Sequence, residues 1–252
     1  MSKKLGSIVI FCCSVIMGLF ADLMILYYIS FHRVLYVPFL MKRYLAEYHP
    51  EIRLGMSEAS LEEAITKVLL FMKGLSEEGD FTVSFLDGST LQFLNSKEIF
   101  HLEEVWRLIH KGQHLLLGLG IFSAVFLVTF GVACFMSRKA AEPKQAAASF
   151  PVLGARSLAK GLIFSKILLA AILAGVGIYA ASDFHHFVIV AHQLFFDGDH
   201  WLLSYSTDRL LSLCPEGILL EGVVWVGAGL VLGILIQIGI SIFILRKTKK
   251  IK

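Results

Sequence analysis

Four long apolar runs, separated by more polar segments, constrain the fold of this chain more than any motif does. They span residues 5–29, 115–136, 162–181 and 218–245. Each run approaches or exceeds the ~20 residues that a helix needs to cross a bilayer. Hydrophobic residues make up 56% of the 252 residues, more than the roughly 45–50% of a soluble domain. The sequence therefore predicts an all-α membrane protein with four transmembrane helices.

The basic residues predict how these helices are oriented. Lysine and arginine gather at the N-terminus, in segment 137–161 and in the tail 246–252, which share one side of the membrane if the chain crosses it four times. Basic residues in short flanks mark the cytoplasmic side. Both termini and segment 137–161 are therefore expected in the cytoplasm, and segments 30–114 and 182–217 outside it. The formal net charge of +3 does not indicate a nucleic-acid partner.

The first apolar run follows two lysines and has a second interpretation as a secretory signal peptide. Its apolar stretch is longer than the ~7–15 residues of a signal-peptide core. No cleavage site of the A-x-A type follows it. We therefore interpret residues 5–29 as a retained membrane anchor.

Segment 30–114 is expected to form a small extracytoplasmic cap that contains both helix and strand. Ser57 is a suitable N-cap for a helix from Glu58 to about Lys73, in which apolar residues recur at helical spacing. Further along, two short runs with alternating apolar residues flank the pair Asp87-Gly88. This pattern predicts a β-hairpin with a tight turn.

A second cap helix is predicted to begin near Asn95, because Asn95 and Glu98 have the spacing of a capping box. His101 lies on this helix. If the helix continued straight, about 20 Å of rise would separate His101 from the second apolar run. We therefore expect a bend at Gly112, which would lay the helix along the membrane interface with Trp106 as an anchor.

The second extracytoplasmic segment gathers imidazoles and carboxylates between two apolar runs, and three interpretations of it are open. The groups belong to His185, His186, His192, His200, Asp183, Asp197 and Asp199. They suit a metal site, since both groups bind zinc, although their spacing fits no standard zinc motif. They also suit a solvated loop, with a turn at Asp197-Gly198-Asp199 and Trp201 at the membrane surface. Finally, histidine suits acid–base catalysis because it takes and returns protons near neutral pH.

Two segments resemble the motifs of a known family, the lipoprotein intramolecular transacylases. Residues 96–105, SKEIFHLEEV, resemble the first motif, and residues 191–201, AHQLFFDGDHW, resemble the second. Residues 207–211 and 215–217 resemble the continuation toward the last span. Four spans with an outward cap are what the resemblance implies for the fold.

The resemblance also implies an activity. Members of this family move an acyl chain from the sn-2 oxygen of the diacylglyceryl group on a lipoprotein's N-terminal cysteine to the α-amino group of that cysteine. The product is an N-acylated lyso-form lipoprotein. The implied partners are the diacylglyceryl-modified N-terminus and membrane lipid, with no metal, nucleotide or other cofactor. The implied location is the outer face of a bacterial cytoplasmic membrane.

The family's catalytic histidines map onto His101 and His192. The carboxylates beside His101 would favour its protonated form, and the apolar neighbours of His192 would favour a neutral ring. We therefore expect His192 to be the base and His101 to be the acid or oxyanion donor. The residues expected to support or orient the two histidines are Glu98, Glu104, Asp197, Asp199 and Trp201.

Two other functions compete with this interpretation. A metal-dependent membrane hydrolase would use the histidine and aspartate cluster of residues 183–200. A non-enzymatic membrane assembly factor would have an ordinary cap without chemistry.

Overall fold

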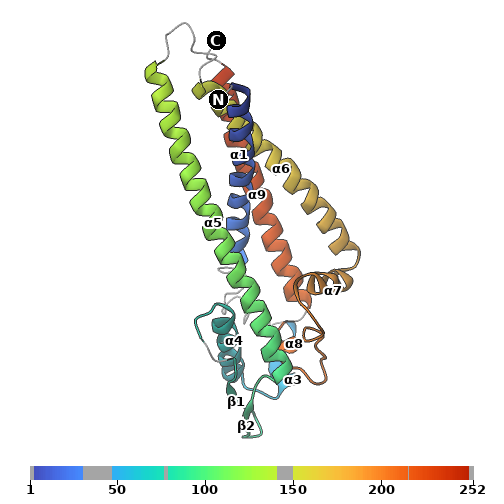
Figure 1. Ribbon diagram of the computed structural model, residues 1–252. Coiled ribbons are helices and arrows are strands. Elements are labelled where there is room, and N and C mark those ends of the chain that lie inside the picture. The colour runs from blue at the N-terminus through green and yellow to red at the C-terminus, as the bar shows by residue number, and fades with distance from the viewer. Residues whose placement is uncertain (1–2, 31–46, 77–78, 141–149, 215, 250–252) are drawn as a thin grey trace. The chain divides into compact units, whose positions relative to one another are not determined.

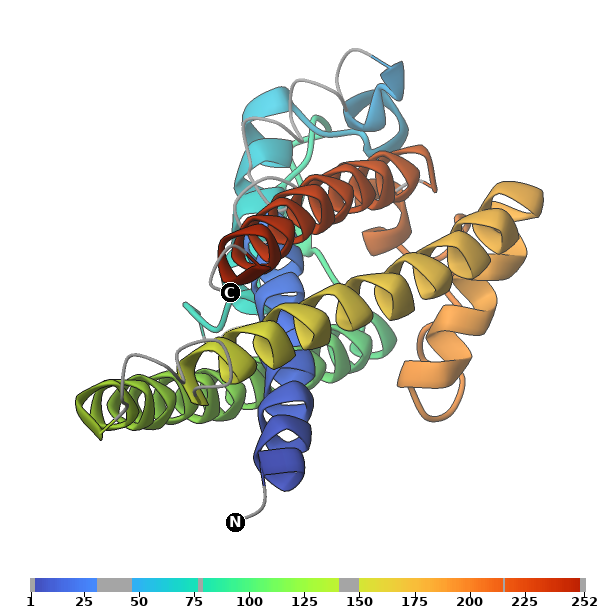
Figure 2. The same ribbon diagram turned by 90° about the horizontal axis from the view of Figure 1, so that it is seen from above.

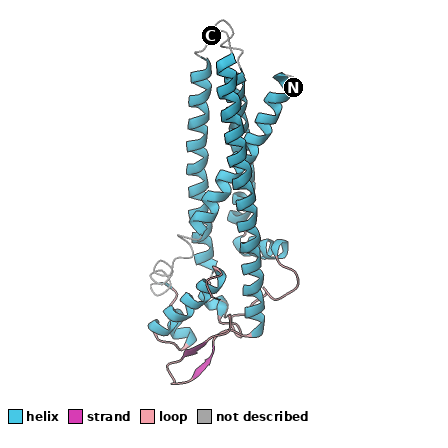
Figure 3. Cartoon of the chain, turned by 60° about the vertical axis from the view of Figure 1, so that its left-hand side comes forward, coloured by secondary structure: helices cyan, strands magenta, loops and turns pink. Residues whose placement is uncertain are grey.

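The computed structural model describes residues 3–30, 47–76, 79–140, 150–214 and 216–249. Its helices are α1 (Lys3–Ile29), α3 (Pro50–Leu54), α4 (Glu58–Met72), α5 (Ser96–Ala140), α6 (Phe150–Ser182), α7 (Phe184–Phe195), α8 (Leu210–Leu213) and α9 (Glu216–Lys249). The strands are β1 (Thr82–Ser84) and β2 (Thr90–Gln92) (Figure 1). Figure 3 shows that most of the described chain is helical. An all-α membrane protein with a small strand-containing cap is therefore confirmed.

The chain divides into two compact units. The helical unit contains Met1–Tyr27, His114–Ile178 and Val226–Lys252, and the cap unit contains Tyr28–Gln113 and Tyr179–Trp225. Each unit is thus assembled from segments that are far apart in the sequence. All the side chains that the sequence analysis selected as site candidates belong to the cap unit.

Within the described residues, four helices are long and apolar enough to cross a membrane, as the sequence predicts. They cover Lys4–Ile29, Ser96–Ser137, Phe150–Ser182 and Gly217–Lys249. The third begins earlier than its apolar run, so residues 150–161 of the expected cytoplasmic segment are helical. Pro151 does not prevent this, because a proline in the first helical turn has no hydrogen bond to lose.

The helix does not break at Gly112, where the sequence predicts a bend. Helix α5 continues from Ser96 to Ala140 as 45 residues of unbroken α-helix. A single glycine costs a helix only about 1 kcal/mol relative to alanine, and sharp kinks usually need a proline or an inserted side chain. The apolar residues on both sides of Gly112 continue the helical pattern, so α5 stays continuous.

The cap unit is organised around a small apolar core. Ser57 caps α4 by accepting a hydrogen bond from the backbone N–H of Ser60 at 3.1 Å, as expected. The apolar face of α4 packs with the hairpin, α5 and α8; the fully buried members of this core include Leu61, Ala64, Phe93 and Leu94. Strands β1 and β2 pair antiparallel, with Val83 opposite Leu91. Gly88 has a φ of 84° in the turn between them, which confirms the predicted hairpin.

The helical unit is held by close contacts of α1 with α6 and α9. A Cβ at Gly161 of α6 would lie 2.5 Å from the Phe11 carbonyl oxygen, and a Cβ at Gly233 of α9 would lie 2.4 Å from the Ile25 side chain. Seen from above, α1 in blue passes beside α6 in yellow (Figure 2). Small residues at such crossings let helices approach closely in a membrane, where the lipid competes for apolar contacts.

A buried polar cluster joins the same three helices. Lys166 of α6 forms an ion pair with Asp22 of α1 and donates a 2.9 Å hydrogen bond to the Gly18 carbonyl oxygen. Gln237 of α9 donates to the other Asp22 oxygen at 2.8 Å. Asp22 is 3% exposed and Lys166 is 1% exposed. Because charges inside a membrane are costly unless paired, this cluster favours one arrangement of α1, α6 and α9.

Removing the lysine of this cluster should destabilise the helical unit. In Lys166→Met, the Asp22 carboxylate loses its cation, and breaking a buried ion pair costs roughly 3–5 kcal/mol. The double variant Asp22→Asn with Lys166→Met removes both charges and should recover most of the loss. Thermal unfolding in detergent measures both effects, with the exposed Lys160→Met as the matched control. A double variant no more stable than the single one would show that the unpaired charge is not the cause.

Candidate active site

The buried carboxylate of Glu98 connects the start of α5 to a distant segment of the cap unit. One oxygen accepts a 2.7 Å hydrogen bond from the Asn95 N–H, and Asn95 in turn accepts one from the Glu98 N–H at 2.9 Å. This is the predicted capping box. The other Glu98 oxygen accepts from the Leu210 N–H at 2.5 Å. The glutamate therefore has a structural role, and both its oxygens are engaged away from the His101 ring.

Three further side chains fasten the segment before α8 to the same place. Asp208 accepts hydrogen bonds from the Asn95 side-chain amide at 2.7 Å and from the Ser204 N–H at 2.6 Å. Arg209 donates to the carbonyl oxygens of residues 92 and 93 at 2.7 and 3.0 Å. Lys97 donates to the Leu202 carbonyl oxygen. Residues 202–210 are thereby held against the hairpin and the first turn of α5.

Helix α7 presents His192 near its C-terminal end. Asp183 caps the helix by accepting from the His186 N–H at 2.9 Å. The Nδ1 atom of His192 lies 2.7 Å from the Val188 carbonyl oxygen. Because a carbonyl can only accept, Nδ1 carries the hydrogen, and in the neutral ring Nε2 has the free lone pair. The ring is flanked by Phe196 and Trp201, with centroids 5.5 and 5.4 Å away.

The structure brings His101 and His192 together within the cap unit. Their ring centroids are 5.8 Å apart, and the Phe196 ring lies 5.0 Å from His101 in an edge contact. His101 is 7% exposed, whereas His192 is half-buried. The two histidines that the resemblance selects therefore lie next to each other, and the Phe196 ring contacts both.

The surroundings of His101 differ from those expected. Its Nδ1 is buried without a hydrogen-bond partner among the described residues. The nearest carboxylate oxygen, Glu104 Oε2, is 3.9 Å away, which is too far for a hydrogen bond. With Glu98 engaged elsewhere, burial dominates, and burial favours neutral imidazole over imidazolium. The expectation that flanking carboxylates keep His101 protonated is therefore wrong.

The remaining candidates occupy different places around the pair. Asp197 lines a small pocket together with Glu104. The Asp199 carbonyl oxygen accepts from the Leu202 N–H at 3.1 Å, so its backbone takes part in a turn. Trp201 donates its ring N–H to the Gly198 carbonyl oxygen at 2.9 Å, which holds the indole against His192. His200 instead packs on Phe100, with ring centroids 4.1 Å apart.

The side chains of residues 183–200 are not arranged as a metal site. Asp183 is used as a helix cap, and the His186 Nδ1 lies 2.8 Å from the Tyr179 hydroxyl. No group of three or more histidine, cysteine, aspartate or glutamate side chains within the described ranges is placed to hold a metal ion. The described residues therefore offer no set of side chains that could act as metal ligands, as the metal-site interpretation requires.

Sequence reasoning did not anticipate the roles of Asp208, Arg209 and Phe196. The first two lie in the continuation that resembles the family, at residues 207–211, and that resemblance is the signal that could have selected them. Phe196 lies inside the second motif but is an ordinary apolar residue in a local view. Its contact with His192 is local, four residues apart, but its contact with His101 depends on the tertiary structure.

Two imidazoles at this separation can exchange protons with one small reacting group. General acid–base catalysis requires each catalytic nitrogen to come within about 2.6–3.2 Å of the proton that it moves. A neutral buried ring suits a base, and a half-exposed ring with its Nδ1–H bonded to a carbonyl can be protonated at Nε2. The arrangement therefore suits a reaction in which one group loses a proton while a neighbouring group gains one.

Comparisons with known proteins agree with one another. The family model described as lipoprotein intramolecular transacylase Lit matches residues 7–218. A solved structure of the membrane-integral lipoprotein intramolecular transacylase Lit from Bacillus cereus is 12% identical to this chain, with a TM-score of 0.63 and coverage of 98% of each chain. A variant of that protein with a histidine-to-arginine substitution matches with 11% identity and a TM-score of 0.58, over 99% of this chain and 95% of its own. No curated protein sequence matches this chain.

The Asp208 carboxylate should make the stability of the cap unit depend on pH in the acidic range. Burial acts to raise the pKa of Asp208, but the hydrogen bonds from Ser204 and Asn95 outweigh it, so the pKa lies below its usual 3.8. A group with a lowered folded-state pKa stabilises the fold above its usual pKa, and this stabilisation is lost as the pH falls through the lowered pKa.

Asp208→Asn should therefore cost roughly 1.5–3 kcal/mol of stability at pH 7, the usual contribution of hydrogen bonds to a charged group. The difference from the wild type should shrink below about pH 4. Thermal unfolding between pH 3 and 7 measures it, with the exposed Asp80→Asn as the control. A difference that does not change with pH would contradict this role of the charge.

Proposed function

Because this chain belongs to the lipoprotein intramolecular transacylase family, and is therefore a membrane-integral acyltransferase, we propose that it moves the sn-2 acyl chain of a diacylglyceryl-modified lipoprotein to the α-amino group of the same N-terminal cysteine. The reaction breaks an ester C–O bond, forms an amide C–N bond and leaves a hydroxyl on the glycerol. His101 and His192 are the catalytic residues.

The observation that carries this proposal is the meeting of His101 and His192, whose ring centroids are 5.8 Å apart. They come from α5 and α7, and each lies in one of the two segments that resemble the family motifs. Since the acyl donor and the amine acceptor belong to one substrate residue, binding places them next to each other. The enzyme then has to supply mainly orientation and proton transfer.

The environments of the two rings suggest a division of roles opposite to the one expected from the sequence. His101 is buried and neutral, so it is the base that takes a proton from the substrate ammonium group. His192 is half-buried, and as imidazolium it can donate from Nε2 while Nδ1–H stays bonded to the Val188 carbonyl oxygen. It stabilises the oxyanion and then protonates the departing glycerol oxygen. His192, neutral after this donation, takes up the second proton that the nitrogen loses as the amide forms, and His101 releases the first to solvent, which restores both rings.

The proposed site lies on the extracytoplasmic face of a bacterial cytoplasmic membrane, with both termini in the cytoplasm. Contacts inside the helical unit support this topology. Arg156, near the start of α6, donates to the Thr248 carbonyl oxygen near the end of α9 at 2.7 Å. Gly154 of α6 adjoins Ile10 of α1 and Phe130 of α5. The basic ends of the four helices therefore gather at one end of this unit, as four alternating spans require.

His101→Ala and His192→Ala should each lower the transfer rate by about 10²- to 10⁴-fold, the usual contribution of a general acid or base. Mass spectrometry of a synthetic diacylglyceryl-cysteinyl peptide incubated with the purified variants measures the N-acylated product. His186→Ala, on the same helix as His192 but bonded to Tyr179, is the matched control and should be much milder. Wild-type activity in His101→Ala would overturn the paired-histidine mechanism.

Cysteine labelling should establish the orientation in the membrane. In a variant without the native cysteines, Asp87→Cys in the hairpin turn should react with a membrane-impermeant maleimide added from outside. Gln145→Cys, which lies outside the described residues, should react only after the membrane is permeabilised, because basic residues flank it. The reverse labelling pattern would contradict both the orientation and the side on which the site is placed.

A further inference from the structure

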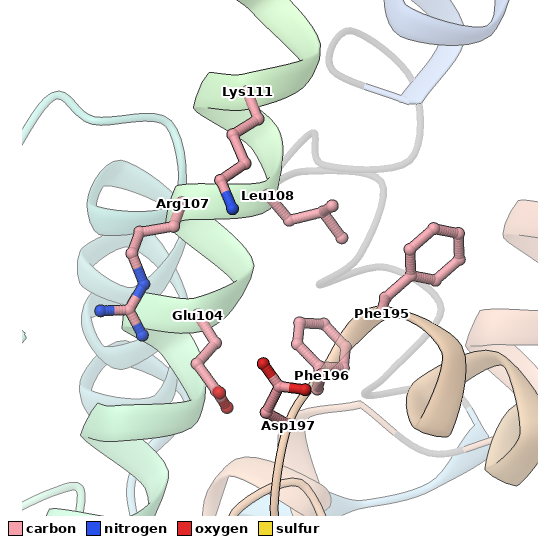
Figure 4. A pocket seen from close by; sticks show the side chains of 7 residues that line it. All are labelled: Glu104, Arg107, Leu108, Lys111, Phe195, Phe196 and Asp197. Carbon is pink, nitrogen blue, oxygen red and sulfur yellow. The ribbon is translucent and has the colours of Figure 1, made fainter.

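A small pocket in the cap unit is lined by Glu104, whose Oε2 lies 3.9 Å from His101 Nδ1, and by Phe196, whose ring contacts both histidines. It has a volume of about 250 Å³, below the ~300–1,000 Å³ typical of pockets for drug-sized ligands. It therefore fits a head group better than a complete acylated cysteine. Helix α5 and the chain around the end of α7 supply its lining, which comprises Glu104, Arg107, Leu108, Lys111, Phe195, Phe196 and Asp197 (Figure 4).

The Glu104 side chain in the pocket lining has a buried carboxylate oxygen without a hydrogen-bond partner among the described residues. The Glu104 side chain is 11% exposed and the His101 side chain is 9% exposed. Both Glu104 Oε2 and His101 Nδ1 are buried without a hydrogen bond among the described residues. Leaving a buried polar group unsatisfied costs about 1–3 kcal/mol, and more when the group is charged. A ligand that donates hydrogen bonds to both atoms would remove this cost.

The charges around the pocket favour a cationic donor. Figure 4 shows that Glu104 comes from α5 and Asp197 from the chain that follows α7, and both line the pocket. Neither forms an ion pair with Arg107 or Lys111, although all four side chains are described. The Arg107 guanidinium instead lies 5.7 Å from the centre of the Phe100 ring. The two carboxylates therefore form no ion pair with the two cationic side chains that also line the pocket.

We propose that Glu104 and Asp197 bind the α-ammonium group of the substrate's N-terminal cysteine and hold it next to His101. This inference rests on the proposed function and names the part of the substrate that the pocket recognises. An α-amino group has a pKa of about 7.7–8.0 and arrives mostly as ammonium at neutral pH. Its three N–H donors match the two carboxylates and the His101 nitrogen.

The same arrangement prepares the amine for attack. One ammonium N–H proton passes to the Nδ1 of His101, which leaves a neutral amine with a free lone pair. The amine nitrogen then forms its bond to the ester carbonyl carbon and loses a second proton, which goes to His192 once that ring has protonated the departing glycerol oxygen, while a carboxylate retains the one N–H that stays in the amide. The imidazolium formed at His101 lies beside the Glu104 carboxylate, with Nδ1 and Oε2 3.9 Å apart, and is stabilised by its charge. Glu104 is thus a substrate-binding residue whose charge also assists the proton transfer.

Binding of unreactive ligands tests this subsite without relying on turnover. The probe is a cysteinyl peptide whose glyceryl group carries ether-linked chains, so that no acyl group can move, compared with the same molecule lacking the α-amino group. Wild-type enzyme in lipid nanodiscs should bind the ammonium ligand at least about tenfold more tightly, as expected for charge-assisted hydrogen bonds. Glu104→Gln should lose most of this preference without weakening binding of the des-amino ligand.

Matched variants separate recognition of charge from a purely structural role. Asp197→Asn should reduce the preference, Glu104→Asp should retain most of it, and Glu103→Gln, exposed on the same helix, should leave it unchanged. A tenfold preference that persists in Glu104→Gln, or equal binding of both ligands by the wild type, would overturn the ammonium subsite while leaving the proposed function intact. Failure of the wild type to bind either ligand would overturn the proposed function together with the subsite.

Discussion

The buried carboxylate of Glu98 is the interaction on which the rest of the cap unit depends. It accepts one hydrogen bond from the start of its own helix and one from the Leu210 N–H. A carboxylate that is 1% exposed is tolerated because both its oxygens are satisfied by backbone donors. This one side chain therefore caps α5 and fastens the segment that follows the second motif. The two motifs can form one site because they belong to segments held together in this way.

The site also depends on rigid elements beneath it. His101 projects from a continuous 45-residue helix whose first turns are anchored in an apolar core with α4 and the hairpin. His192 projects from α7, where its Nδ1–H bond to Val188 and the flanking rings restrict the imidazole. Such support is needed because proton transfer is sensitive to displacements of a fraction of an ångström. The unfilled hydrogen-bonding capacity of Glu104 and His101 is confined to the place where the substrate amine is proposed to bind.

The membrane helices form for a different physical reason than the cap unit does. In a bilayer every backbone polar group must be satisfied within the segment, so many apolar sequences are compatible with the same set of helices. This explains how a chain with 12% identity to a solved relative keeps a TM-score of 0.63. A few positions instead determine which helices pack together in the helical unit. They include the close contact at Gly161 and the Asp22–Lys166–Gln237 cluster. The cluster lies outside the cap unit that holds the site, and its role is to set which helices meet.

The sequence by itself determined the features that depend on neighbouring residues. The four spans, the Ser57 cap, the hairpin at Gly88 and the Asn95–Glu98 capping box all follow from local hydrophobicity, turn preference or hydrogen bonds between residues close in the chain. The family resemblance selected His101 and His192, but neither the resemblance nor a local pattern contains the distance between their rings.

Only the tertiary structure decided the electrostatics of the site. It buried His101, engaged Glu98 with the Leu210 N–H and placed Glu104 in the lining of the pocket. It also kept α5 helical through Gly112. These outcomes depend on contacts between segments far apart in the chain. The free energies of burial and hydrogen bonding at those contacts outweigh the local preferences that a sequence pattern records.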